Sequence, residues 1–370
     1  MRVKSFSLVL GLALAFLFSS CGKRSSINKV EVTVGSVLPL TGPVASYGKN
    51  AKSGVDMALQ EINSEGKLKI HVIYEDDAGE AQTAVSATQK LIYTDKVPLI
   101  IGEAASGLSL AIAPVCNSNK VVLFSPISSA AELTEKGGDY FFRVCPSDAF
   151  QARVLADWLL SQKLTLVSLL FINNSWGVSL KDEFVLYYTK GGGTVLSTET
   201  CNEGDRDFKS HLTKMAKPKV QAFVAFTYGK EGGPFLRQAS ELGIKLPIYG
   251  GDVWGSPELL EAAGESAEGV YFTFPASPKS EKYEAFAKKY RAQYGKEPDV
   301  YAAYAYDLAY VVANAFTSGA KTGEQLRQFL VSMTPYEGVT GKTQFDRNGD
   351  VVTKTFDRKM IKNGKYVIAE

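Results

Sequence analysis

From about residue 30 onward, short apolar runs alternate with amphipathic runs. VEVTVGSV (Val30 to Val37), VPLIIG (Val97 to Gly102) and VVLFSP (Val121 to Pro126) are continuous and rich in Val, Ile and Leu. Such runs are typical of parallel strands that are covered on both faces. Because a helical pattern follows each of them, the sequence predicts repeated β-α-β units, which favour an open doubly wound sheet.

FFRVCPSD, Phe141 to Asp148, interrupts this alternation, and a second series begins after it. TLVSLLFINNSWG, VQAFVAFTYG and GVYFTFPASP predict strands of a second sheet. The helices expected in the second half of the chain are 178–190, 207–217, 231–243, 279–294, 299–318 and 323–333. The predicted fold class is therefore α/β, with two doubly wound parallel-sheet lobes joined by three crossover segments.

The crossovers are expected near 145–148, 274–278 and 337–341. We assign residues 30–145 plus 277–338 to an N-terminal lobe and residues 146–276 plus 339–370 to a C-terminal lobe. Two Asn-Gly pairs, at Asn348 and Asn363, lie between apolar or β-branched runs, which predicts hairpins in the C-terminal segment.

The first twenty residues have the pattern of an export signal. Arg2 and Lys4 precede an uncharged run from Phe6 to Phe18 that is too short to span a bilayer as a mature helix. Because Cys21 follows two serines, residues 1–20 resemble a bacterial lipoprotein signal peptide, although Phe18 stands where Leu is usual. We expect lipidation of Cys21, a tether over 21–29, and anchoring to a membrane in the periplasm or at the cell surface. The alternative is an ordinary signal peptide with an incidental cysteine.

Charge and motifs narrow the classes of function. Without residues 1–20 the chain has 39 basic and 39 acidic residues, so no basic face for nucleic acid is expected. The two histidines, His71 and His211, lie in a strand pattern and a helix pattern. No G-x-S-x-G, H-E-x-x-H, Walker or Cys/His zinc motif occurs, so we expect no enzyme, no cofactor and no metal.

Three cysteines remain after Cys21, namely Cys116, Cys145 and Cys201. An odd number permits at most one disulfide among them. Cys116 with Cys145 is the expected pair, and three buried small apolar side chains are the alternative.

The candidate binding chemistry lies after the strands, where open parallel sheets bind ligands. The connection LPLTGPVASYG, Leu38 to Gly48, is longer than a plain strand-to-helix loop requires. The segments after the strands carry hydroxyls, rings and one acid, namely Thr41, Ser106, Ser128, Ser129, Tyr47, Trp176, Tyr228, Trp254 and Asp252. Hydroxyls and N–H groups suit an anion and a carboxylate suits a cation, which together fit a small polar ligand.

Several family-like motifs follow one another along the chain. They are LTGPVASYG, IGEAASGLSLAIAPV, LFSPISSAAELTEKG, INNSWGVSL, YGGDVWGSPELLEAAGESAEGV and YEGVTGKTQFDRNGD. With them, from about Val30 to the C-terminus, the chain resembles the branched-chain amino-acid (Leu/Ile/Val)-binding family of bacterial ABC importers. These are type I periplasmic binding proteins. The resemblance implies two lobes that close around an amino-acid-like ligand, a membrane permease as partner, and a monomer.

The resemblance also implies roles for particular residues. Ser106 and Ser129, with nearby N–H groups, would hold a ligand carboxylate, and Ile127 would add a backbone contact. Asp252 falls where the family has an acid that receives the ammonium group. The aromatic residues complete the expected site: Trp176 and Tyr228 would cover the ligand, and Tyr47 would close the side-chain pocket.

The sequence departs from the family's leucine binder, which has Thr at Ser129, Tyr at Trp176 and Glu at Asp252. A shorter acid and a larger ring would reshape the pocket, so an amino-acid-like zwitterion is favoured and leucine itself is left open.

Structural roles remain alternatives for these residues: helix caps for the serines, a turn for the acid, core packing for the rings. For the whole protein, a ligand-sensing domain for a receptor or an exported α/β enzyme remains the alternative. In YAAYAYDLAY, residues 301–310, the spacing predicts a core helix in which Asp307 is a satisfied structural acid.

Overall fold

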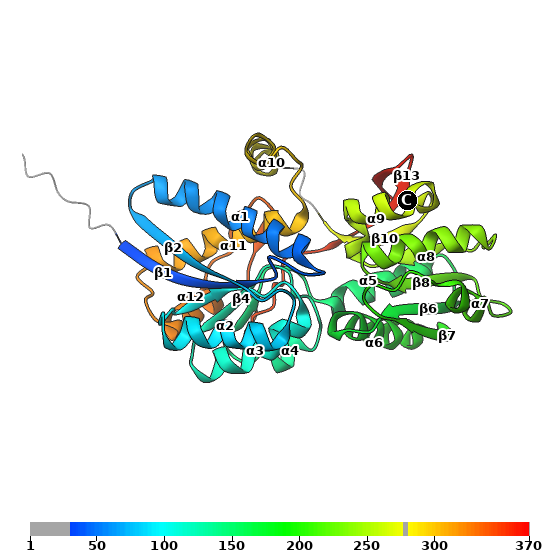
Figure 1. Ribbon diagram of the computed structural model, residues 1–370, viewed down its shortest axis with the longest axis horizontal. Helices are drawn as coiled ribbons and strands as arrows, with labels where there is room; N and C mark the ends of the chain where they lie inside the picture. Colours follow the sequence, from blue (N-terminus) through cyan, green and yellow to red (C-terminus); the bar gives the residue numbers. More distant parts are fainter. Residues whose placement is uncertain (1–29, 277–279, 370) are drawn as a thin grey trace, which may run out of the picture.

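The structure, a computed structural model, describes residues 30–276 and 280–369. Two lobes lie side by side along the long axis of the molecule, and each is built around a parallel sheet (Figure 1). The signal peptide and tether predicted over residues 1–29, including the lipidation expected at Cys21, lie outside the described residues.

The first lobe contains a five-stranded sheet in the order β2-β1-β3-β4-β5. All of its paired strands are parallel, as the continuous apolar runs predicted. The strands are β1 (Val30–Leu38), β2 (Leu68–Asp76), β3 (Leu99–Ile101), β4 (Val122–Ser125) and β5 (Phe141–Arg143).

Helices cover both faces of this sheet (Figure 1). One face packs with α1 (Ala45–Ser64), α10 (Glu281–Tyr294), α11 (Val300–Thr317) and α12 (Gly323–Ser332), which form the larger core of this lobe. The other face packs with α2 (Ala81–Tyr93), α3 (Ser106–Ser118) and the short α4 (Leu133–Lys136). The first lobe is therefore doubly wound, with its last three helices supplied by a distant part of the chain.

The second lobe contains a seven-stranded sheet in the order β14-β13-β10-β9-β8-β6-β7. Its first five strands in the chain pair in parallel, and the C-terminal hairpin adds two antiparallel strands. The strands are β6 (Leu166–Ile172), β7 (Thr194–Cys201), β8 (Ala222–Phe226), β9 (Ile248–Gly250), β10 (Tyr271–Pro275), β13 (Phe356–Lys362) and β14 (Lys365–Ile368). The helices are α5 (Asp148–Ser161), α6 (Ser175–Lys190), α7 (Lys209–Met215), α8 (Gly229–Glu241), η1 (Asp252–Gly255), α9 (Pro257–Ala263) and η2 (Gly264–Ala267).

The chain passes between the lobes three times, after β5, after β10 and before β13. We expected the last passage near residues 337–341, but Val339, Phe345 and Val351 still pack in the larger core of the first lobe. The short strands β11 (Tyr336–Gly338) and β12 (Gly341–Thr343) also precede this passage. The side chains therefore place the last passage after residue 351, later than the boundary at residue 339 that we assigned.

Asp307 explains why this segment stays with the first lobe. Its carboxylate accepts hydrogen bonds from the backbone N–H groups of Val339 and Thr340, both at 2.8 Å, and from the Thr340 hydroxyl. The prediction of a satisfied structural acid is confirmed. Gly338 is required beside it, because a Cβ there would lie 2.3 Å from the carboxylate.

Both predicted hairpins are present. Phe345 and Val351 form an antiparallel bridge around the first Asn-Gly pair. The second Asn-Gly pair, Asn363 and Gly364, joins β13 to β14. The triple glycine at 191–193 follows the end of α6.

The disulfide expected between Cys116 and Cys145 is wrong. Both thiols are free and buried, as is that of Cys201. The physical reason is their position: Cys145 packs on the α1 and α11 face of the first sheet, whereas Cys116 packs on the opposite face. Burial raises the pKa of the Cys116 thiol to about 12, so it behaves as a small apolar side chain.

The contact between α1 and α11 sets the position of the first lobe's cleft edge, and Gly54 makes it possible. A Cβ at Gly54 would lie 2.0 Å from the backbone carbonyl oxygen of Ala302. We therefore expect Gly54→Ala to destabilise the protein by roughly 1–3 kcal/mol from overpacking, despite a helix-propensity gain of about 1 kcal/mol. Urea unfolding measures this, with the exposed Gln60→Ala on the same helix as control. A Gly54→Ala variant as stable as the wild type would show that the helices are not in close contact.

Candidate functional site

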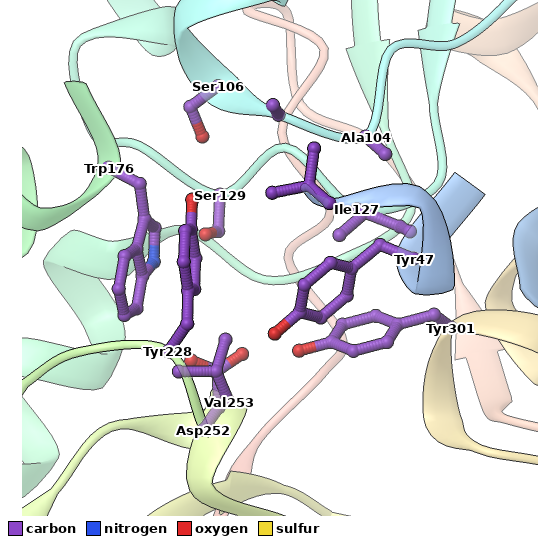
Figure 2. Close-up of a pocket in the computed structure, with 12 residues that line it drawn as sticks. Tyr47, Ala104, Ser106, Ile127, Ser129, Trp176, Tyr228, Asp252, Val253 and Tyr301 are labelled. Carbon is purple, nitrogen blue, oxygen red and sulfur yellow. The ribbon is translucent and has the colours of Figure 1, made fainter. Parts of the chain in front are cut away.

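A pocket lies between the two lobes, and all seven predicted site residues line it (Figure 2). It encloses about 440 Å³ of space, counted with its opening to solvent. The lining residues are Val44, Tyr47, Ala104, Ala105, Ser106, Ile127, Ser129, Trp176, Tyr228, Asp252, Val253 and Tyr301. Among these described residues none is Lys, Arg or His, so the pocket contains one acid and no base.

Tyr47 reaches the pocket from the first turn of α1, which begins at Ala45. The preceding loop is held by Asp76 at the end of β2. Its carboxylate accepts from the backbone N–H groups of Leu40 at 2.8 Å and Thr41 at 3.1 Å, and from the Thr41 hydroxyl at 2.7 Å. The long loop is therefore fixed, and it directs the start of α1 toward the cleft.

Ser106 and Ser129 bring hydroxyls from two neighbouring strand ends. Ser106 is the first residue of α3, and its Oγ accepts a hydrogen bond from the Ala130 N–H at 3.1 Å. Ser129 lies in the loop after β4, next to Ile127 in the pocket wall. Hydroxyls beside the N-terminus of a helix form an environment that favours an anionic group.

Arg143 fixes the loop that carries Ser129. Its buried guanidinium donates to the Ala130 carbonyl at 2.8 Å and the Ser128 carbonyl at 3.4 Å, on either side of Ser129. Nε of the same side chain donates to Asp350 at 2.6 Å. The loop is thus tied to a segment more than 200 residues away in the sequence.

The second lobe contributes the aromatic wall. Trp176, in the first turn of α6, stacks on Tyr228 with ring centroids 5.2 Å apart and planes inclined by 12°. The Tyr228 hydroxyl accepts a hydrogen bond from the Asn174 side chain at 3.1 Å. Tyr47 approaches Tyr228 from the first lobe at 5.8 Å, so the rings meet across the cleft (Figure 2).

Asp252 is the acid of the pocket and begins η1 directly after β9. Its side chain is 7% exposed, and its Oδ1 has no hydrogen-bond partner among the described residues. Burial raises the pKa of this carboxyl to about 6, while the nearby Gln151 amide, the backbone N–H groups and the Tyr301 hydroxyl oppose the shift. A buried carboxylate oxygen without a donor can receive a positively charged donor from a ligand.

Sequence reasoning missed Tyr301, which lies in the first turn of α11 and closes the pocket beside Tyr47. The two rings meet edge to face at 5.5 Å (Figure 2). We interpreted the run 301–310 as core, and Tyr301 does contribute to the core of the first lobe as well. Its position at a helix start was the available signal, because helix starts face the cleft elsewhere in this fold. Burial raises the pKa of Tyr301, so its hydroxyl stays protonated.

Within residues 30–276 and 280–369, no group of three His, Cys, Asp or Glu side chains is arranged to hold a metal ion. In the same part of the chain, no helix has the length and apolar character to cross a membrane.

The profile of the family described as "Periplasmic binding protein" matches residues 31–361, which is most of the chain. The chain belongs to this family. The Leu/Ile/Val-binding protein BraC3 of Rhizobium johnstonii is 28% identical over 377 residues that cover 100% of both chains. Homologues of periplasmic binding proteins thus match the whole chain, and the resemblance inferred from its motifs is confirmed.

Solved structures agree with this fold. LivJ, the branched-chain amino acid transporter substrate binding protein of Streptococcus pneumoniae, was solved in complex with isoleucine. It is 34% identical, with a TM-score of 0.83 over 92% of this chain and 99% of that one. A solute binding protein of an ABC transporter from Rhodopseudomonas palustris, in complex with 3,4-dihydroxybenzoic acid, is 26% identical, with a TM-score of 0.80 over 91% and 96%. The fold class of two parallel-sheet lobes is confirmed by these type I periplasmic binding proteins.

The raised pKa of Asp252 predicts a pH-dependent cost in the ligand-free protein. The folded value of about 6 exceeds the ordinary 3.8, so the folded state holds this proton more tightly, and stability is lost as the pH rises through 6. Asp252→Asn removes the ionisable group. We expect its stability relative to the wild type to increase from near zero below pH 4 to roughly 1–3 kcal/mol above pH 7. Thermal unfolding at several pH values measures the difference, and a difference independent of pH would contradict the assignment.

Proposed function

We propose that this chain is the extracytoplasmic solute-binding protein of an ABC importer and captures an amino acid or similar small zwitterion between its two lobes. It acts as a monomer that binds and releases its ligand unchanged, without enzymatic chemistry. One observation carries the proposal: the hydroxyls of Ser106 and Ser129 line the same pocket as a buried acid, Asp252, whose Oδ1 has no hydrogen-bond donor in the described part of the chain, where no basic side chain lines that pocket.

The carboxylate of the ligand is assigned to the first lobe. Ser106 and Ser129 offer hydroxyl groups, and the backbone around Ile127 and the N-terminus of α3 offers N–H donors. The ammonium group is assigned to the second lobe, where Asp252 has a free acceptor oxygen. Each lobe thus recognises one charged end, and the ligand connects them.

The remainder of the ligand is assigned to the aromatic residues. Trp176 and Tyr228 form one wall, and Tyr47 with Tyr301 forms the other, joined by Val253 (Figure 2). Such walls suit an aliphatic or aromatic side chain by burying its apolar surface. The isoleucine and dihydroxybenzoic acid of the two solved relatives are compatible with this character.

Direct hydrogen bonds also join the two lobes to each other, without a ligand between them. Nζ of Lys230 in α8 donates to the Pro43 carbonyl of the first lobe at 2.9 Å. Ser179 in α6 accepts from the Ala131 N–H at 2.8 Å. Closure around a ligand excludes water, which strengthens a charged hydrogen bond to roughly 1.5–3 kcal/mol.

A thermal-shift screen of the twenty amino acids tests the proposal. A ligand present at about 100 times its Kd adds ~2.7 kcal/mol of stability, which gives a clear shift. For the amino acid found, Asp252→Ala is expected to weaken binding by roughly 2–5 kcal/mol, because the ammonium group would be left unpaired. Asp182→Asn, exposed on α6, is the control and should bind like the wild type. Stabilisation by none of the amino acids would contradict the proposal.

We also propose that the protein is a lipoprotein anchored through Cys21, with a membrane permease as its partner. A lipid-modified Cys21 gives stable attachment, since each buried CH₂ contributes ~0.8 kcal/mol. Cys21→Ser is expected to move the protein from the membrane fraction to the soluble extracytoplasmic fraction. Cys201→Ser is the control and should remain attached. If Cys21→Ser stays in the membrane fraction, the lipid anchor is wrong.

A further inference from the structure

Asp148 is a buried acid that neither the fold nor the pocket lining accounts for. It begins α5, immediately after the first passage between the lobes, and its side chain is fully buried. Neither of its carboxylate oxygens has a hydrogen-bond donor among the described residues. Because an unpaired buried carboxylate is costly, such a group calls for a function or a bound partner.

The first turn of α5 touches both halves of the candidate site. The backbone N–H of Asp148 donates to the Ser129 carbonyl at 2.8 Å. One turn later, Gln151 packs against the residue before Asp252: a Cβ placed on Gly251 would lie 3.3 Å from Nε2 of Gln151. The start of α5 therefore contacts the Ser129 segment of the first lobe and the segment before Asp252 in the second lobe.

Several buried hydrogen-bond acceptors in this region have no donor among the residues that the structure describes. Oδ1 of Asp252, both carboxylate oxygens of Asp148, and Oε1 of Gln151 are all buried acceptors without a donor. The Gln151 amide nitrogen already donates to the Thr273 hydroxyl at 3.0 Å. Four acceptors without a donor are complementary to a positively charged group with several N–H bonds.

The charged side chains near Asp148 do not supply such a positively charged donor. Asp252 and Glu183 are acids that oppose its ionisation, and the neighbouring Cys145 thiol is protonated, since burial raises its pKa. Arg143 is the nearby cation, but its guanidinium already binds Asp350 and the carbonyl of Ala130.

We propose that Asp148 is a positioning residue of the ammonium end of the site, a second carboxylate that acts through Asp252 and Ser129 and selects ligands that carry an amine. This inference rests on the proposed function. It assigns to Asp148 the discrimination between an amino acid and the same molecule without its amino group.

Binding should then change the protonation of Asp148. In the ligand-free protein, burial and the charge of Asp252 raise the pKa of Asp148 well above its usual range. The nearby Ser129 hydroxyl, which lies outside hydrogen-bond geometry, and the charge of Arg143 oppose this shift. An ammonium group nearby favours the ionised form. Binding of an amine is therefore accompanied by proton release, which calorimetry in buffers of different ionisation enthalpy counts directly.

The experiment compares Asp148→Asn with the wild type and with Asp157→Asn, an exposed residue on the same helix. The probes are the twenty amino acids and, for each one that binds, the carboxylic acid that lacks its amino group. For Asp148→Asn we expect roughly tenfold weaker binding of the amino acid, less than twofold change for its deaminated counterpart, and less proton release. Asp157→Asn should leave all three quantities unchanged.

Each outcome is decisive. Equal weakening of both probes, or no weakening, with unchanged proton release would overturn the role of Asp148 while the proposed function stands. If the wild type binds none of the amino acids, the proposed function fails, and this inference fails with it. Unfolding cannot imitate the expected result, because Asn has nearly the same shape as the protonated acid, so Asp148→Asn should melt close to the wild-type temperature.

Discussion

An acid kept out of water without a counter-charge is the constraint that organises this cleft. Asp252 ends a strand of the second lobe, and the lobes cover it so completely that one carboxylate oxygen has no partner. The arrangement is unfavourable for an empty protein and favourable for one that holds a cation there. A binding protein gains affinity in this way, because a cationic group of the ligand removes the free-energy cost of burying the unpaired carboxylate.

The rest of the structure serves to keep that geometry fixed. Asp76 fixes the loop before α1, Arg143 fixes the loop of Ser129, and Asp307 fixes the turn at 339–340. Each uses a buried or well-bonded charge to immobilise backbone. Asp76 and Arg143 do so in loops that carry pocket residues, so that Tyr47 and Ser129 are in place before a ligand enters. Such preorganisation reduces the entropy lost on binding.

The local pattern of the sequence was sufficient to predict the architecture and most of the residues that line the pocket. Val-rich runs, helical spacing and two Asn-Gly pairs predicted the sheets, helices and hairpins. Seven pocket residues followed from strand ends and from the resemblance. Tyr301 was missed because a ring at helical spacing has the same pattern whether it faces a core or a cleft. The supposed Cys116–Cys145 disulfide failed because spacing cannot tell which face of a sheet a side chain occupies.

The interleaving of the two lobes along the chain has a consequence for biogenesis. The larger core of the first lobe needs Val351, and the second sheet needs β13 and β14, which end at Ile368. During synthesis, neither half can finish folding until nearly the whole polypeptide has emerged.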